Sequence, residues 1–194
     1  LSWDVGLRCA NPTYVLSLNI QQRYSMSHID LFRGQTSLGS FSLPQHVTGK
    51  SSIYRLQRAV RKGGNGVVFT ASVVKTNRTN GLPFAIKFLR QQDSSRIDRF
   101  NNEVRVLAEL SSPNIAHYFD HGEITVDGYN VPWVAMDLGH CNMREEIQGF
   151  GKLNLVRLKA VVPQICAAID HLHSKHFIHR DIKPENFVWK DEKK

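Results

Sequence analysis

The sequence holds 194 residues, 41% of them hydrophobic and 22% charged, which suits one globular core or one core and part of another. Its formal net charge is +8, but the basic residues are spread along the chain, so we expect a solvated surface and no nucleic-acid partner. No apolar run approaches the length of about 18 residues that a bilayer requires, so we expect no membrane span.

The first 50 residues are difficult to assign. Residues 13–20 have the pattern of a strand, whereas residues 34–50 are rich in Ser, Gly and Gln and are predicted to form a loop or linker. We leave residues 1–50 as an unassigned N-terminal segment. Because the first residue is Leu and nothing near it resembles a targeting segment, we expect a cut N-terminus.

From residue 51 the pattern becomes clearer. Residues 53–60 and 67–74 are predicted strands joined by a Gly-rich turn, and residues 84–89 are a third strand. Apolar residues at helical spacing predict a helix over 97–110, followed by a strand over 131–138. An apolar run predicts a long helix over 156–173, although Pro163 weakens its first turn. The order of elements indicates an α+β fold.

The Gly-rich turn is a candidate phosphate site. Its glycines permit φ > 0 and a close approach of the backbone, whose N–H groups can cradle phosphate oxygens. A hairpin that needs glycine only for its turn geometry is the alternative, and the turn alone favours that alternative. The residues concerned are Arg61, Lys62, Gly63, Gly64, Asn65 and Gly66.

A lysine and a glutamate further along are a candidate ion pair. In the strand over 84–89, Ala85 and Lys87 share one face, opposite to the bulkier apolar residues. Glu103 falls within the apolar stripe of the following helix, and a carboxylate aimed at a core needs a cationic partner. Lys87 is the obvious candidate, and an exposed place at the edge of the stripe is the alternative.

Residues 179–186, HRDIKPEN, carry the chemistry of a phosphoryl transfer. Asp181 can accept the proton of an attacking hydroxyl, and Lys183 can neutralise charge on the transferring group. Asn186 offers an amide oxygen to a hard cation such as Mg²⁺. So many polar roles in eight residues directly after an apolar helix match a defined signature rather than a plain turn.

Together these motifs resemble a eukaryotic-type protein kinase domain of the Ser/Thr-directed kind, in order and at suitable spacing. The resemblance implies an α+β, protein kinase-like fold. Residues 51–137 would form a small β-rich N-lobe with an antiparallel sheet and one helix. Residues 138–194 would form the hinge and the incomplete start of a helical C-lobe.

The resemblance also implies roles for single residues. Lys87 would hold the α- and β-phosphates of ATP and pair with Glu103, while Asp181, Lys183 and Asn186 would be catalytic, with Asn186 on Mg²⁺. An internal hydrophobic spine would include Leu107, Tyr118 and His179, and Arg180 would contact a phosphorylated activation loop. The other residues implied to surround the nucleotide are Val60, Val68, Ala85 and Val188, the gatekeeper Met136, and the hinge residues Asp137, Leu138 and Gly139.

The sequence departs from the kinase pattern in four places, one of which, Ser112 in place of the usual His before Pro113, is expected to matter little. Arg61 occupies the first glycine position of the loop, which puts its closure over the phosphates in doubt, although Arg61 could itself reach them. Asn65 stands where an aromatic residue often lies at the loop tip. The chain ends without the Asp-Phe-Gly metal site or an activation segment, so we expect a partial domain, with Asp-Phe-Gly about 15–20 residues past Asn186 in a longer sequence.

The function expected from this resemblance is ATP- and Mg²⁺-dependent transfer of a phosphoryl group to a Ser or Thr hydroxyl of a protein. The 194-residue chain alone is expected to be inactive. One alternative is a natural truncation that binds nucleotide, or acts as a decoy, without catalysis. Another is a small-molecule kinase such as an antibiotic phosphotransferase, which generally lacks the Lys-Pro-Glu inside its loop. The unpaired spacing of Cys9, Cys141 and Cys166 is typical of an intracellular protein, and the oligomeric state is not indicated.

Overall fold

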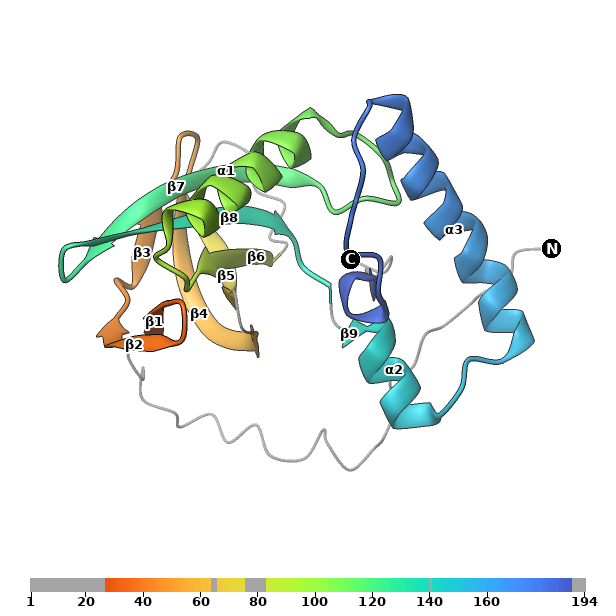
Figure 1. Ribbon diagram of the computed structural model, residues 1–194, viewed down its shortest axis with the longest axis horizontal. Coiled ribbons are helices and arrows are strands. Elements are labelled where there is room, and N and C mark those ends of the chain that lie inside the picture. Colours follow the sequence, from red (N-terminus) through yellow and green to blue (C-terminus); the bar gives the residue numbers. More distant parts are fainter. Residues whose placement is uncertain (1–26, 64–65, 76–82, 140, 190–194) are drawn as a thin grey trace.

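The computed structural model describes residues 27–63, 66–75, 83–139 and 141–189. Its largest element is a six-stranded antiparallel sheet in the order β3-β4-β5-β6-β8-β7 (Figure 1). The strands are β3 (His46–Thr48), β4 (Ile53–Lys62), β5 (Gly66–Lys75), β6 (Phe84–Leu89), β7 (Tyr118–Val126) and β8 (Tyr129–Asp137).

One face of the sheet encloses the main apolar core. Trp133, Phe69 and Phe88 are the largest side chains that are fully buried there, and Tyr54 packs edge-on against Trp133 with ring centroids 5.7 Å apart. The sheet curls so strongly that its first and last strands, β3 and β7, come into contact. Aromatic and β-branched residues favour such a twisted, enclosed sheet.

Helix α1 (Ser94–Glu109) packs on the opposite face of the sheet, where it contacts β7 and β8 (Figure 1). Phe100 and Val104 of the helix are buried against Leu89 and Val134 in a second, smaller cluster. Leu107, Tyr118 and Met136 pack at its margin. The helical spacing of these apolar residues is what places α1 on the sheet.

A hairpin of β1 (His28–Arg33) and β2 (Thr36–Ser42) precedes the large sheet and packs against its core. The prediction of a loop or linker over residues 34–50 is therefore wrong, because this stretch contains β2 and β3. Leu38, Phe41, Leu43 and Val47 carry enough apolar surface to join the core despite the many Ser and Gly residues. The strand predicted over residues 13–20 lies outside the described residues.

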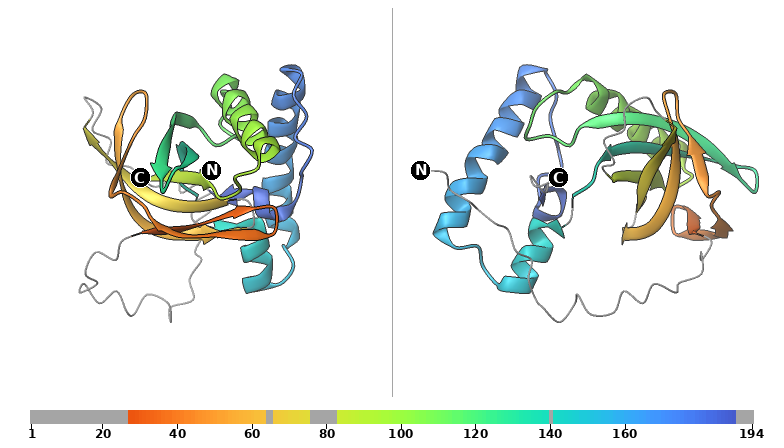
Figure 2. Two further views of the ribbon diagram at one scale, coloured as in Figure 1. Left: turned by 60° about the vertical axis from the view of Figure 1, so that its left-hand side comes forward. Right: turned by 180° about the vertical axis from the view of Figure 1, so that it is seen from behind.

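The remaining elements lie on the other side of the molecule (Figure 2). They are β9 (Cys141–Asn142), α2 (Met143–Phe150), α3 (Leu155–Ser174), the 3-10 helix η2 (Pro184–Asn186) and β10 (Val188–Trp189), which pairs with β9. Asn142 begins α2 with a capping box, accepting from the Glu145 N–H at 2.8 Å. Arg157 of α3 forms an ion pair with Glu146 of α2, with both side chains largely buried.

The predicted α+β architecture of a β-rich lobe followed by helices is confirmed. The strands predicted from residue 51 onward and both predicted helices are present within a few residues of their expected limits, and α3 runs uninterrupted through Pro163. Strand β7 was not predicted. Among the described residues, every helix is too short or too polar to cross a lipid bilayer.

Candidate active site

The Gly-rich turn connects β4 to β5 and closes on itself through its backbone. The Gly63 N–H donates to the Gly66 carbonyl at 2.8 Å. A Cβ on Gly66 would lie 3.0 Å from the Phe88 carbonyl, so a larger residue there would push β5 and β6 slightly apart. Gly64 and Asn65, which were predicted to belong to the phosphate site, lie outside the described residues.

Arg61, at the first glycine position of the kinase pattern, extends away from the turn to α2. Its Nη2 donates to both carboxylate oxygens of Glu145, at 2.8 and 3.1 Å. The side chains of Arg61 and Glu145 are 35% and 47% exposed, so solvent screens much of this ion pair. The contact links the turn to the first part of α2, a connection that no pattern in the sequence indicates.

Strand register places four of the predicted nucleotide-binding residues on one face of the sheet. Val68 pairs directly with Lys87, and Ala85 pairs directly with Met136, so each pair shares a face. Because Ala85 and Lys87 are two residues apart on β6, all four side chains lie on the same side. This is the face that also carries α1 and not the face of the main core.

The connection after β8 is fixed by close contacts. The Asp137 N–H donates to the His117 carbonyl at 3.1 Å, and the Asp137 carboxylate accepts from the His117 N–H at 2.9 Å. A Cβ on Gly139 would lie 2.7 Å from Cβ of Val188, which shows how tightly β10 packs against this connection. Val188 itself is 40% exposed, and Val60 on β4 is 43% exposed, so both present apolar surface to solvent.

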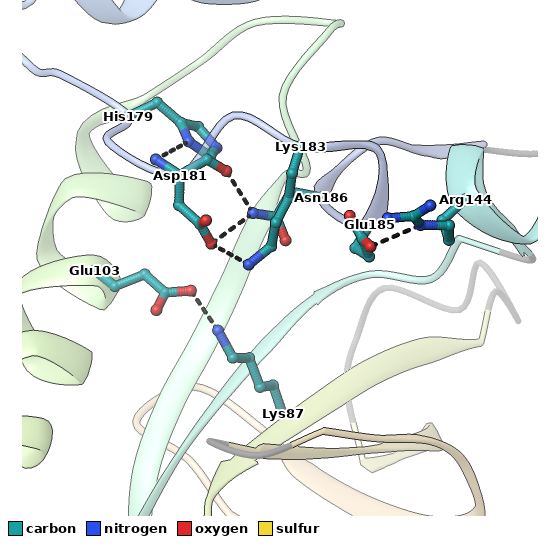
Figure 3. Close-up of polar contacts among 8 residues, drawn as sticks. All are labelled: Lys87, Glu103, Arg144, His179, Asp181, Lys183, Glu185 and Asn186. Atoms are coloured by element: carbon teal, nitrogen blue, oxygen red, sulfur yellow. Dashed lines mark hydrogen bonds and ion pairs between the residues drawn. The ribbon is translucent and has the colours of Figure 1, made fainter.

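Lys87 and Glu103 form an ion pair between β6 and α1, with Nζ donating to Oε1 at 2.5 Å (Figure 3). The Glu103 side chain is 54% exposed, so it lies at the edge of the helix stripe and not within the core. Lys87 also lies over the Phe100 ring, 5.7 Å from its centroid. The pair orients the ammonium group toward the loop at residues 179–186 (Figure 3).

That loop folds around the Asp181 carboxylate. Lys183 Nζ lies 2.7 Å from Asp181 Oδ2, and Asn186 Nδ2 donates to the same oxygen at 3.0 Å and to the Asp181 carbonyl at 2.7 Å. Figure 3 shows the side chains of Asp181, Lys183 and Asn186 gathered on the side of the loop that faces Lys87 and Glu103.

Two hydrogen-bond donors favour the charged form of Asp181. The hydrogen bond from Lys183, and after it the one from Asn186, holds the pKa of the Asp181 carboxyl below its ordinary value. Asp181 is therefore ionised at neutral pH. An exposed carboxylate in this state can accept a proton from a hydroxyl group that approaches it.

The flanks of the loop are anchored to neighbouring elements. Glu185 accepts from Arg144 Nε of α2 at 2.9 Å, and this contact with Arg144 lowers the pKa of the Glu185 carboxyl. Arg180 has φ of 63°, a conformation that non-glycine residues rarely adopt and that the surrounding loop must maintain. The expectation that His179 joins an internal spine is wrong for this structure, because His179 is exposed and its Nδ1 accepts from the Asp181 N–H at 3.3 Å.

A family model described as protein kinase domain matches residues 54–194. The chain belongs to the protein kinase family. The part of the chain that the family model matches includes β4, the Gly-rich turn, Lys87, Glu103 and the whole loop around Asp181. It excludes β1, β2 and β3, which nevertheless pack against the same core.

The chain has relatives among bacterial proteins. It is 31% identical to a probable serine/threonine-protein kinase of Corynebacterium efficiens over 139 residues, which cover 70% of this chain and 20% of that protein. It is 32% identical to the probable serine/threonine-protein kinase PknB of Corynebacterium glutamicum over 139 residues, 70% of this chain and 21% of that protein. Serine/threonine-protein kinase PknA of Mycobacterium tuberculosis is 32% identical over 143 residues, 71% of this chain and 32% of that protein. The chain thus spans between a fifth and a third of the length of these relatives.

Proposed function

We propose that this chain carries the nucleotide-binding and catalytic residues of a protein kinase that phosphorylates Ser or Thr hydroxyl groups. The observation that supports this most is the meeting of two groups of residues. The ion pair of Lys87 and Glu103 faces the cluster of Asp181, Lys183 and Asn186 across one site (Figure 3).

The residues at this site fit ATP and Mg²⁺. Two ammonium groups, those of Lys87 and Lys183, come from opposite sides of the site and suit the negative charge of a triphosphate. Asn186 uses its amide nitrogen for two hydrogen bonds to Asp181, which leaves its amide oxygen as the atom to offer to a hard cation. The face with Val68, Ala85 and Met136, closed by Val188, suits a flat apolar ring.

The chain's own residues then have defined tasks. Bound Mg-ATP would supply the phosphoryl group and most of the charge neutralisation. Asp181, ionised at neutral pH, would accept the proton of the substrate hydroxyl at its carboxylate. Lys183, which contacts Asp181, would neutralise charge on the oxygens of the transferring group, and Lys87, oriented by Glu103, would hold the other phosphates.

Substitution of Lys87 by Met in the full-length protein tests the proposal. We expect phosphoryl transfer from ATP to a Ser- or Thr-containing peptide to fall at least about 100-fold, because positioning and charge at the phosphates supply most of the catalysis. The fold should persist, since the side chain is 28% exposed and its ion pair is not part of the main core. Transfer is measured as peptide phosphorylation, and folding as the circular dichroism melting curve.

Lys152→Met is the matched control, because Lys152 is an exposed residue between α2 and α3, outside the site. It should retain the rate of the unaltered protein. If Lys87→Met also retained that rate, the assignment of Lys87 would be wrong. A Tyr-containing peptide that is phosphorylated faster than its Ser and Thr counterparts would contradict the proposed substrate class.

A second candidate function is nucleotide binding without transfer. The observation that favours it is the use of Arg61 in an ion pair with Glu145, at a position where the kinase pattern has glycine. A protein of this kind would show a higher melting temperature in Mg-ATP but no peptide phosphorylation. A protein that shows both the higher melting temperature in Mg-ATP and peptide phosphorylation would exclude this second function.

A further inference from the structure

The hairpin of β1 and β2, which we call the N-terminal hairpin, lies upstream of the residues that the kinase family model matches. It is nevertheless an integral part of the lobe. Ile29 and Leu31 are 1% and 0% exposed, and both belong to the main apolar core. Figure 2 shows the hairpin along the lower edge of the large sheet, beside β4.

The hairpin reaches the Gly-rich turn through a buried arginine. Arg90 follows β6, and its side chain is 8% exposed. Its Nε donates to the Asp30 carbonyl at 3.0 Å, and its Nη1 donates to the Gly63 carbonyl at 2.7 Å. Its guanidinium also lies 4.7 Å from the centroid of the Phe32 ring. Arg90 therefore joins two residues of β1 to the first glycine of the turn.

The carboxylate of Asp30 adds a second connection. It forms ion pairs with Lys62, the residue immediately before Gly63, and with Arg90 Nη2 at 3.4 Å. The hydrogen bond from Lys62, and after it the one from Ser40 of β2, lowers the pKa of the Asp30 carboxyl, so it is ionised at neutral pH. One carboxylate from the hairpin thus fixes both the residue that enters the turn and the arginine that holds Gly63.

A third connection runs to α1. The Phe32 N–H donates to the Arg90 carbonyl at 2.9 Å, and the Gln92 N–H donates to the Phe32 carbonyl at 2.7 Å. The Gly34 N–H then donates to Asp93 Oδ2 at 2.9 Å. Asp93 is the N-cap residue of α1, yet its side chain makes no capping bond to the helix. The hairpin therefore contacts the backbone all along the segment from the end of β6 to the N-cap of α1, the helix that carries Glu103.

We propose that the N-terminal hairpin positions the Gly-rich turn and α1 of this kinase, and that Asp30 is a positioning residue for the nucleotide site. Of the two elements that the hairpin holds, the turn carries Gly63 and α1 carries Glu103. The inference rests on the proposed function only where it concerns the effect of the hairpin on ATP binding. The effect of the hairpin on the position of the turn is independent of any ligand.

The consequence for binding follows from preorganisation. A turn that is already held needs less ordering when a phosphate arrives, so loss of Asp30 should weaken ATP binding. Because Asp30 acts through partly exposed ion pairs, we expect the dissociation constant for Mg-ATP to rise about three- to fivefold. The affinity for the protein substrate should not change, since the hairpin contacts the turn and α1 and not the loop around Asp181.

The test compares Asp30→Asn with Asp127→Asn in the full-length protein. Asp127 lies in the exposed turn between β7 and β8, and its substitution removes the same charge far from the hairpin. Hydrogen exchange of the Gly63 and Gly66 amides, without nucleotide, measures how firmly the turn is held. Titration with Mg-ATP measures the dissociation constant, and KM for a peptide substrate is measured in parallel.

We expect Asp30→Asn to speed exchange of the two amides and to weaken Mg-ATP binding with peptide KM unchanged, and Asp127→Asn to do neither. Asp30→Glu should show a smaller increase in amide exchange and a smaller loss of Mg-ATP binding than Asp30→Asn, because it keeps the charge. Unchanged exchange in Asp30→Asn, with an unaltered melting curve, would overturn the inference even if the protein binds ATP. If the unaltered protein failed to bind ATP, the proposed function would fail while the exchange experiment still decided the role of the hairpin.

Discussion

Asp181 carries a negative charge that contacts within its own loop favour, and this charge defines what its substitution should do. Asn at this position keeps the shape of the side chain but cannot accept a proton from a hydroxyl group. We expect Asp181→Asn to lower the rate of peptide phosphorylation at least about 100-fold. Asp127→Asn, in the exposed turn between β7 and β8, is the matched control and should have no effect.

The ionisation of Asp181 also predicts how the reaction rate depends on pH. The pKa of Asp181 is lowered by Lys183 and then by Asn186, so its carboxylate remains ionised well below neutrality. Protonation of this group should therefore cause no loss of rate between about pH 8 and about pH 6. A fall in rate over that interval that disappears in Asp181→Asn would contradict this assignment of charge.

Tyr54 should make the protein sensitive to alkali. Burial, and after it the charge of Asp120, raises the pKa of Tyr54 from 10.0 to about 12. Because the folded pKa lies above the unfolded value, the stabilisation is fully present below pH 10.0 and is lost as the pH rises through about 12. Melting temperatures measured at increasing pH should show this loss, and Tyr54→Phe should reduce it. Tyr129→Phe, near the turn between β7 and β8, should leave the loss unchanged.

At the scale of elements, Asp120 of β7 fastens one edge of the sheet to the other. It is 1% exposed, and its carboxylate accepts from the backbone N–H groups of Lys50, Ser51 and Ser52 at 2.9 to 3.1 Å. Those residues form the connection between β3 and β4. The hydroxyl group of Tyr54 donates to the same carboxylate at 3.4 Å.

Asp120→Asn should therefore destabilise the lobe. The new amide group would turn an N–H donor toward backbone N–H groups, leaving buried donors without acceptors. We expect the free energy of unfolding to fall by at least about 2 kcal/mol, measured by urea denaturation. The isosteric change Asp127→Asn, in an exposed turn, should cost far less. Equal stability of the two variants would mean that water replaces the lost acceptor.

The elements show where sequence reasoning succeeds and where it stops. Residues 84–89 and the helix of α1 have clear periodicity, and both are present where it predicts them. The composition of TSLGSFS, the segment of β2, favours a loop because Ser and Gly dominate it, although Ile29 and Leu31 already alternate in β1, the strand before it. A preference for strands depends on the partner that a segment packs against, which local composition does not contain.

The candidate site likewise contains residues that the sequence predicts and contacts that it does not. The residue types at Lys87, Glu103 and Asp181 follow from a known spacing, and the sequence predicted the first two as an ion pair. The contacts of Arg61 with Glu145 and of Arg90 with Gly63 join residues 84 and 27 positions apart in the chain. No periodic signal marks such pairs, because each is created by the way β4, α2 and the end of β6 are brought together.

At the scale of the whole molecule, α3 exposes a broad apolar surface. Leu155, Val156 and Val162 are 66%, 78% and 49% exposed, and Ile178 and Ile182 beyond the helix are 69% and 56% exposed. Apolar surface gathered in this way is typical of a face that other protein covers.

Expressed as these 194 residues alone, the polypeptide should therefore self-associate. We expect Val156→Lys together with Val162→Lys to increase the monomeric fraction in sedimentation velocity experiments, because charge on this face opposes association. Val74→Lys, at a residue of β5 that is 53% exposed, is the control for added charge alone. A polypeptide that is already monomeric at micromolar concentration would contradict the prediction.

The contact between β3 and β7 also has a consequence for how the protein is made. Lys50 and Asp120 are 70 positions apart, and the strands that complete the lobe end only at Asp137. On the ribosome, β6 is synthesised well before β8, the strand that covers its free edge, and long-range closures of this kind are slow. Nascent polypeptides shorter than about 137 residues therefore carry unpaired strands, and they are the species on which we expect chaperones to act.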